Sequence, residues 1–183
     1  MKNKLCTLII MYIYIFITII VIIIINETCL GIYRQLQRNN IFKLAKKRAS
    51  ELNKPLTVVG DPYYGYGSRF YNMFLNGYEC GDKTIDLTGA PLCPNGIKSD
   101  IYDYLKNEKS NSQVIFISCV LEYIDNIEDV INELYRVAGN ENIFIVTVNK
   151  FSLAAFFYSE DNYSAKNLIY APPLYKNITW EKI

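Results

Sequence analysis

The chain has 183 residues, a formal net charge of +1 and no histidine. This length fits one domain of ordinary size once an N-terminal apolar segment is set aside. The missing histidine excludes the usual general base and every Ser-His or Cys-His catalytic pair, and it leaves a zinc site without one of its two main ligands.

The small net charge hides an uneven distribution. Residues 26–54 carry seven Lys or Arg against two Glu, whereas residues 55–183 carry ten basic and sixteen acidic residues. The larger part of the chain is therefore acidic. We predict no nucleic-acid-binding surface on it, because the neutralisation of phosphates needs a basic face.

The cysteines are odd in number and include no Cys-x-x-Cys pair. Their spacing predicts neither a metal site nor a disulfide framework, so reduced thiols are expected. The five residues are Cys6, Cys29, Cys80, Cys93 and Cys119.

Leu5–Ile25 is an uncharged apolar run. As an α-helix it spans about 30 Å, the thickness of the hydrocarbon core of a bilayer. The run is longer than the apolar part of a secretory signal and lacks a small-residue cleavage site. We therefore predict an uncleaved transmembrane signal anchor over residues 1–26 that contacts the lipid bilayer, with a cleaved signal peptide as the alternative. By the positive-inside rule, the basic residues that follow predict a single-pass membrane protein with a cytosolic soluble domain.

Residues 27–54 are predicted to form a basic juxtamembrane helix that ends before Pro55. Its basic side chains suit either anionic lipid headgroups or a solvated face. The apolar residues that recur at roughly helical spacing are Ile32, Leu36, Ala45, Ala49 and Leu52.

Residues 55–183 alternate short apolar runs with helical segments. This alternation predicts an α/β fold with a mostly parallel sheet and flanking helices. A capping-box-like pair, Asp125 and Glu128, is expected to start the helix that Gly139 ends. The predicted strands are 56–60, 83–88, a short segment before Asp100, 113–120 and 142–148. The predicted helices are 69–75, 101–107, 125–138 and 152–158, and a terminal strand pair is predicted at 166–173 and 177–183.

The most specific pattern lies in residues 114–148. A strand leads into Leu121-Glu122-Tyr123, and the helix that follows ends in Arg136-Val137 before Ala138-Gly139-Asn140. This order resembles the class I S-adenosylmethionine-dependent methyltransferases, in which a Leu-Glu-His-like turn, an Arg-Val or Arg-Leu pair and a Pro-Gly-Gly turn take these places. The resemblance covers about residues 56–148, and it implies a Rossmann-like sheet and S-adenosylmethionine as cofactor.

The resemblance also implies a cofactor site at the carboxyl ends of the strands. In that family the loop after the first strand surrounds the methionine part of the cofactor, and acids after the second and third strands meet the ribose and the adenine. The implied cofactor-binding residues are Gly60, Asp61, Gly65, Gly67, Asp86, Asp100, Ser118 and Cys119. Glu122 and Tyr123 are implied substrate contacts, and no residue is identified as catalytic.

The loop after the first strand departs from the acidic-x-Gly-x-Gly-x-Gly pattern of the family. Here residues 60–67 read GDPYYGYG, and Pro62 lacks an N–H donor. A plain strand-to-helix turn is therefore an alternative for this loop. The corresponding alternatives elsewhere are solvated loop carboxylates for Asp86 and Asp100, a helix-start carboxylate for Glu122 and a buried apolar role for Cys119.

These observations predict a membrane-anchored S-adenosylmethionine-dependent methyltransferase-like protein that acts on a lipid, a membrane protein or a small molecule. Methyl transfer requires no histidine, because the sulfonium is already a reactive donor. The alternative is a catalytically inactive module of the same fold that acts as a membrane-tethered interaction protein. A dinucleotide-binding oxidoreductase is disfavoured, since no G-x-G-x-x-G follows the first strand.

Overall fold

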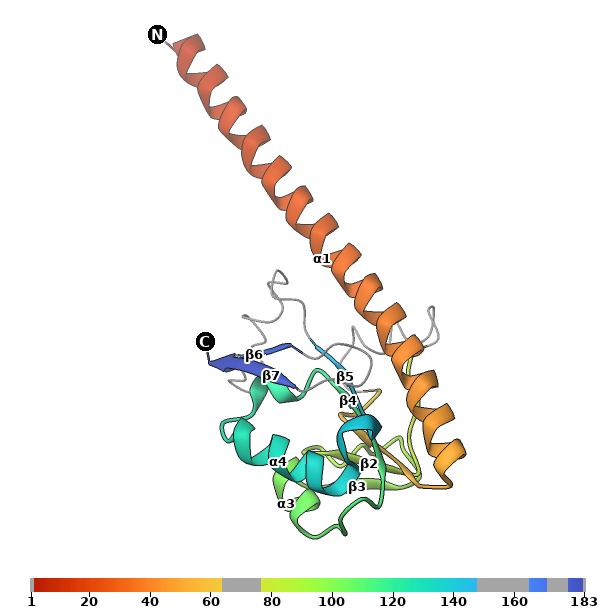
Figure 1. Ribbon diagram of the computed structural model, residues 1–183. Helices are drawn as coiled ribbons and strands as arrows, with labels where there is room; N and C mark the ends of the chain where they lie inside the picture. The colour runs from red at the N-terminus through yellow and green to blue at the C-terminus, as the bar shows by residue number, and fades with distance from the viewer. Residues whose placement is uncertain (1, 64–76, 148–164, 171–177, 183) are drawn as a thin grey trace.

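The computed structural model describes residues 2–63, 77–147, 165–170 and 178–182. A single long helix, α1 (Lys2–Leu52), projects from one side of an α/β domain (Figure 1). The helices predicted at 69–75 and 152–158 lie outside the described residues, as do Gly65 and Gly67.

A five-stranded sheet forms the centre of the domain. Its strand order is β3-β2-β1-β4-β5, and every neighbouring pair is parallel. The predicted α/β fold with a mostly parallel sheet is therefore confirmed. The strands are β1 (Leu56–Val59), β2 (Lys83–Asp86), β3 (Gly96–Lys98), β4 (Val114–Ser118) and β5 (Ile143–Val146).

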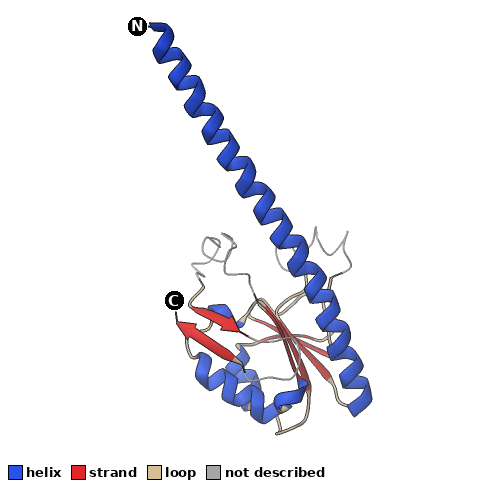
Figure 2. Ribbon diagram, turned by 45° about the horizontal axis from the view of Figure 1, so that its top comes forward, coloured by secondary structure: helices blue, strands red, loops and turns tan. Residues whose placement is uncertain are grey.

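Helices cover both faces of this sheet (Figure 2). Alternate residues of each central strand point to opposite faces: Val58 and Phe116 belong to the core under α1, whereas Val59 and Ile115 belong to the core under α4. Because both faces are covered, β1 and β4 are buried along their length and mostly apolar, as is usual for buried parallel strands. The second layer consists of α3 (Ile101–Lys106) and α4 (Ile127–Ala138).

The predicted apolar face of α4 is confirmed, and so is its end at Gly139, but its predicted start is wrong. The N-cap residue is Asn126, which makes no side-chain capping bond. Asp125 instead pairs with Lys166 at 2.6 Å, a residue distant in sequence. Between β4 and α4 the chain forms a short 3-10 helix, η1 (Leu121–Tyr123), and a second one, η2 (Asn140–Asn142), precedes β5.

The predicted terminal strand pair is confirmed. β6 (Asn167–Tyr170) and β7 (Thr179–Lys182) form a separate antiparallel sheet. The Asn167 side chain donates to the carbonyl of Ile124 at 2.6 Å, and the Tyr135 hydroxyl accepts from the N–H of Ile178 at 2.8 Å. These bonds attach the small sheet to the segment around η1 and to α4.

The second half of α1 is one layer of the domain. The predicted helix over these residues is confirmed. Of the apolar residues at helical spacing, Ala45 and Ala49 are buried, whereas Ile32 and Leu36 are 37% and 48% exposed. The buried face of this half also includes polar residues, which a purely apolar pattern misses. The buried residues are Gly31, Gln35, Arg38, Ile41, Phe42, Ala45 and Ala49. Of these, Ile41, Phe42, Ala45 and Ala49 share a core with residues of the sheet.

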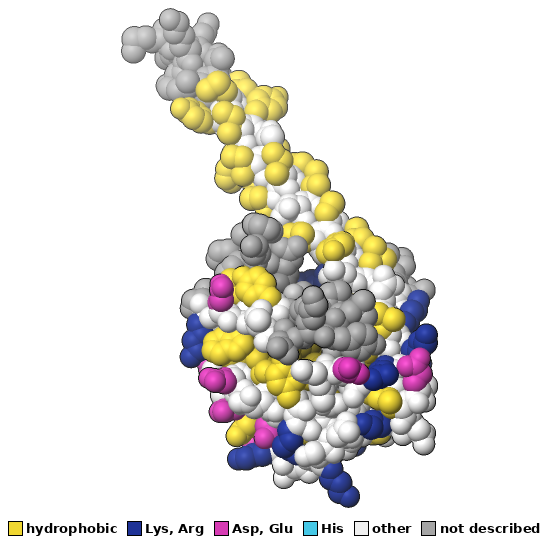
Figure 3. Space-filling model, in the orientation of Figure 1, with side chains coloured by type: hydrophobic (Ala, Val, Ile, Leu, Met, Phe, Trp, Pro, Cys, Tyr) yellow, Lys and Arg dark blue, Asp and Glu magenta, His cyan; other side chains and the backbone are white. Residues whose placement is uncertain are grey.

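The first half of α1 carries exposed apolar side chains from Ile9 to Ile25 (Figure 3). By length and composition this helix is a candidate membrane span. No break separates it from the packed half, since α1 is continuous across residues 26 and 27. The span and the domain therefore share one helix axis.

Two cysteines are disulfide-bonded, contrary to the expectation of reduced thiols. Cys80 and Cys93 are joined with their Cα atoms 5.6 Å apart. The sheet brings them together, because the N–H of Asp82 bonds to Leu56 and the N–H of Thr84 bonds to Asn95. Neither pairing is visible in the cysteine spacing.

The packing of α1 against the sheet predicts that Phe42→Ala strongly destabilises the domain. The Phe42 ring is 4% exposed and lies 5.4 Å, centroid to centroid, from Phe116 in an edge-on arrangement. Loss of this ring should lower the free energy of unfolding by about 3 kcal/mol. Urea unfolding of the full chain in detergent, followed by near-UV circular dichroism, measures this. Leu44→Ala, at a position 40% exposed on the same helix, is the matched control; equal effects of the two variants would contradict the packing.

Candidate functional site

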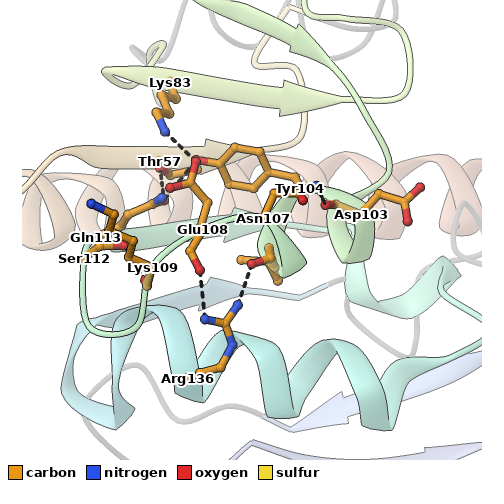
Figure 4. Close-up of polar contacts among 11 residues, drawn as sticks. Thr57, Lys83, Asp103, Tyr104, Asn107, Glu108, Lys109, Ser112, Gln113 and Arg136 are labelled. Carbon is orange, nitrogen blue, oxygen red and sulfur yellow. Dashed lines mark hydrogen bonds and ion pairs between the residues drawn. The ribbon is translucent and has the colours of Figure 1, made fainter.

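Polar side chains gather at both ends of the central strands, and those at the amino ends form a hydrogen-bonded network (Figure 4). Within the described part of the chain, the buried Gln113 Nε2 atom of this network has no hydrogen-bond partner. Gln113 Oε1 accepts from the Thr57 hydroxyl at 2.6 Å and from the Tyr104 hydroxyl at 3.1 Å. Lys83 pairs with Glu108 at 2.6 Å. These bonds connect β1, β2 and the start of β4 to the end of α3.

Arg136 extends the network to α4. Its guanidinium donates to the backbone carbonyls of Leu105 and Glu108 at 2.7 and 2.8 Å and forms an ion pair with Glu133. This arginine, part of the motif that carries the family resemblance, therefore joins α4 to the segment after α3. We assign the whole network at the amino ends a structural role, since ligands of open α/β sheets bind at the carboxyl ends.

Lys83 and Glu108 stabilise each other's charged forms. Burial lowers the pKa of Lys83, but the hydrogen bonds to Glu108 and Tyr104 outweigh it, and the pKa is raised. Burial raises the pKa of Glu108, but the hydrogen bond from Lys83 and the neighbouring Tyr104 outweigh it, and the pKa is lowered. Both groups therefore stay charged over a wide pH range.

At the carboxyl ends, Gly60 closes β1 with φ +99°. A Cβ atom there would lie 3.1 Å from the carbonyl oxygen of Ser118 and 3.1 Å from Cγ2 of Val120. Only glycine suits both the backbone angle and the close approach to β4. Its N–H donates to the carbonyl of Ile85 at 2.9 Å, so this group is used within the fold and is not an open donor for a ligand.

Asp86 and Asp61 lie together, as the resemblance implies. The Asp86 carboxylate accepts from the N–H of Asp61 at 3.0 Å and from the N–H and hydroxyl of Thr88 at 2.7 and 2.6 Å. The Asp61 carboxylate accepts from the N–H of Tyr63 at 2.8 Å. Asp86 thus fastens the loop after β1 to the turn after β2, and these bonds use most of its acceptor capacity.

Asp100 has a local structural role. It is exposed and forms the N-cap of α3, where its side chain accepts from the N–H of Tyr102 at 2.7 Å. It follows the third strand as predicted, and the neighbouring N–H of Ser99 donates to the carbonyl of Asp86 at 3.2 Å. The backbones after β2 and β3 are therefore adjacent.

Ser118 and Cys119 end β4 beside Gly60. Ser118 is 4% exposed, and within the described part of the chain its Oγ atom has no hydrogen-bond partner. Cys119 has φ +54° and a half-buried side chain, and its N–H donates to the carbonyl of Val146 at 2.8 Å. Glu122 follows in η1, 4% exposed, and the half-buried Tyr123 comes next.

Two residues that we did not predict as site residues complete this edge: Arg38 of α1 and Tyr78. The Arg38 Cζ atom lies 5.7 Å from the Tyr78 ring centroid, and the Tyr78 hydroxyl donates to the carbonyl of Gly60 at 3.3 Å. The Tyr78 hydroxyl lies beside Ser118 but makes no hydrogen bond of normal geometry to it. Burial raises the pKa of Tyr78 above its usual range, so its phenol is neutral.

Arg38 remains charged although it is only 9% exposed. Burial lowers the pKa of Arg38, but neighbouring Cys119, Tyr78 and Glu122 outweigh burial and raise it. The sequence contains a pattern that could have predicted the burial of Arg38. Arg34 and Arg38 are spaced from Ala45 and Ala49 by whole helical turns, so they lie on the face of α1 that packs against the domain.

The structure thus gathers Gly60, Asp61, Asp86, Ser118 and Cys119 at one edge. It places Asp100 close by but uses it as a helix cap. The buried polar residues at this edge are Arg38, Ser118 and Glu122. Gly65 and Gly67 lie outside the described residues. Comparisons with known protein families, curated proteins and solved structures find no significant match.

The Lys83–Glu108 pair predicts a pH-dependent stability. The pKa of Glu108 is lowered from 4.5, so its contribution is present above that value and is lost as the pH falls through its lower folded pKa. Lys83, raised from 10.5, loses its contribution only as the pH rises through its higher folded pKa. Glu108→Gln should therefore cost about 1 kcal/mol at neutral pH, a modest value because the pair is partly solvated.

Urea unfolding at acid and neutral pH measures this difference. The difference between the wild-type chain and Glu108→Gln should shrink at acid pH. Asp103→Asn, on the exposed side of α3, controls for the loss of one acid. A difference that is the same at both pH values would show that the ion pair contributes nothing.

Proposed function

We propose that the chain is a membrane-anchored S-adenosylmethionine-dependent methyltransferase-like protein. One observation carries the proposal: the polar groups at the carboxyl edge lie where the strand order reverses, between β1 and β4. In open α/β sheets of the Rossmann-like type, ligands bind at this switch point. Gly60 and Ser118, from the two strands, lie there in direct contact range.

One buried polar atom among the described residues at this edge, the hydroxyl oxygen of Ser118, is free to bond to a ligand. The Ser118 Oγ atom is buried and has no hydrogen-bond partner among the described residues, and buried polar atoms in native proteins are usually satisfied. A bound polar ligand at the switch point would supply the missing partner. When bound, S-adenosylmethionine would bring a reactive methyl group to this edge.

The Asp86 carboxylate and the Gly60 N–H fit the cofactor less well. Both are already bonded within the fold. These internal bonds favour the second candidate function, a module of the same fold that lacks methyl transfer and acts as a membrane-tethered interaction protein. Binding of the methyl donor distinguishes the two.

Calorimetry with S-adenosylmethionine should show saturable binding that Asp86→Ala abolishes, because Asp86 holds the loop after β1 against the switch point. The full chain in detergent is required, since α1 covers one face of the sheet. Asp103→Ala, an exposed acid on α3, should bind like wild type. Absence of heat with a folded wild-type chain would exclude the methyltransferase proposal and favour the interaction module.

We also propose that Leu5–Ile25 spans a membrane with the domain in the cytosol. The basic residues after the span support this side. The Cys80–Cys93 disulfide favours the opposite side, because such bonds persist mainly in oxidising compartments.

Protease digestion of sealed microsomes decides between the two sides. We expect the domain to be degraded without detergent, leaving a protected fragment that contains the span. A domain that is protected until detergent is added would place it in the lumen and contradict the cytosolic proposal.

A further inference from the structure

We propose that the outer face of α1, the face turned away from the domain, binds a second copy of this chain in a parallel helix pair. The pair crosses the membrane and continues into the first turns beyond it. This inference rests on the proposed membrane insertion of α1 and is independent of methyl-donor binding. Three observations carry it: exposed apolar side chains beyond the span, the placement of charges around the helix, and a seven-residue repeat along the outer face.

The outer face of α1 stays apolar after the candidate span ends. Ile32, Tyr33 and Leu36 are 37%, 56% and 48% exposed. Leu36 precedes the buried Ala45 by about two and a half helical turns, so the two lie on opposite sides of α1, and the same spacing separates Ile32 from the buried Ile41. A helix that packs on one side normally has polar residues on the other. These turns instead carry an apolar face on each side, and the described strands lie along one of them (Figure 2).

The charged residues of this part of α1 avoid the outer face. Within residues 5–42 they are Glu27, Arg34 and Arg38. At about 3.6 residues per turn, these three lie within about 40° of one another around the helix axis, on the side where Arg38 is buried. The first charged residue on the outer face is Lys43. Two copies can therefore approach along the face before Lys43 without burying a charge, which would be costly.

A seven-residue repeat defines a seam along the outer face. Its positions alternate in spacing between four and three residues over more than three repeats, a pattern typical of paired helices. Isoleucines surround the span on all sides, so the members that define the seam are those of other types and those beyond the span. Thr18 is one of the small polar residues enriched at helix contacts in membranes, and its hydroxyl is satisfied by the carbonyl of Tyr14 at 2.8 Å. The seam residues are Met11, Ile15, Thr18, Ile22, Ile25, Cys29, Ile32 and Leu36.

A second copy fits this face because the seam is self-complementary. Two copies inserted in the same direction are parallel, and a two-fold axis along the seam places each residue against its own counterpart. Cys29, which is exposed and not disulfide-bonded, then meets the same cysteine of the second copy. The two domains do not collide, since each packs on the face of α1 opposite to the seam. A different partner would need a matching seam, whereas a second copy carries one by construction.

Oxidative cross-linking tests the seam. The full chain with Cys6→Ser is reconstituted in phosphatidylcholine liposomes, which are floated to show insertion and then treated with copper-phenanthroline. We expect a covalent dimer through Cys29. In a Cys6→Ser, Cys29→Ser background, Leu36→Cys should also cross-link, whereas Gln37→Cys, one position off the seam, should do so severalfold less.

Two results would overturn the proposed pair and leave the membrane span intact: no dimer through Cys29 in chains that float, or equal cross-linking at positions 36 and 37. A chain that does not float with the liposomes would overturn the membrane insertion and the pair together.

A second measurement needs no cross-link. Energy transfer between donor-labelled and acceptor-labelled chains, followed as the protein-to-lipid ratio falls, gives the dissociation constant of the pair. Leu36→Gln should weaken pairing about tenfold, because it replaces a leucine that the pair buries. Leu44→Gln, at a position 40% exposed on the same helix beyond the seam, should pair like wild type. Equal weakening by both variants would overturn the proposal, and so would absence of energy transfer in the wild-type chain, which would leave the outer face to a different membrane protein.

Discussion

The packing of α1 against the sheet is the contact on which the rest of the structure depends. Ala45 and Ala49 let the helix approach β4 and β5 closely, and Phe42 fills the space against Phe116 and Tyr78. Without this layer, one whole face of the sheet would be open to water. Because the helix continues without a break into its apolar half, the same contact sets how the domain stands relative to the candidate span.

Both ends of the sheet keep buried polar atoms without a hydrogen-bond partner among the described residues. At the amino ends, most groups bond to one another or to backbone carbonyls, but Gln113 Nε2 lacks a partner. At the carboxyl ends, Ser118 Oγ and Arg38 Nε lack one. Unsatisfied buried groups alone therefore do not distinguish the candidate site from the opposite end. Its position at the point where the strand order reverses does.

The resemblance predicted the positions of Asp86 and Asp100 in the fold correctly, but in the structure both carboxylates bond to nearby backbone N–H groups. Asp86 and Asp100 do follow the second and third strands. Each carboxylate, however, accepts from nearby backbone N–H groups, Asp86 from Asp61 and Thr88, and Asp100 from Tyr102. A carboxylate beside a turn or a helix start satisfies those donors readily, and sequence position alone does not tell this use from ligand binding.

The sequence by itself determined the alternation of strands and helices, the buried face of α4 and the apolar half of α1, because each follows from periodicity within a short segment. Only the tertiary structure decided the pairing of Cys80 with Cys93, the contact of Asp125 with Lys166, and the position of Arg38 over the end of β4. These depend on which distant segments meet when the layers pack, and no local pattern encodes that meeting.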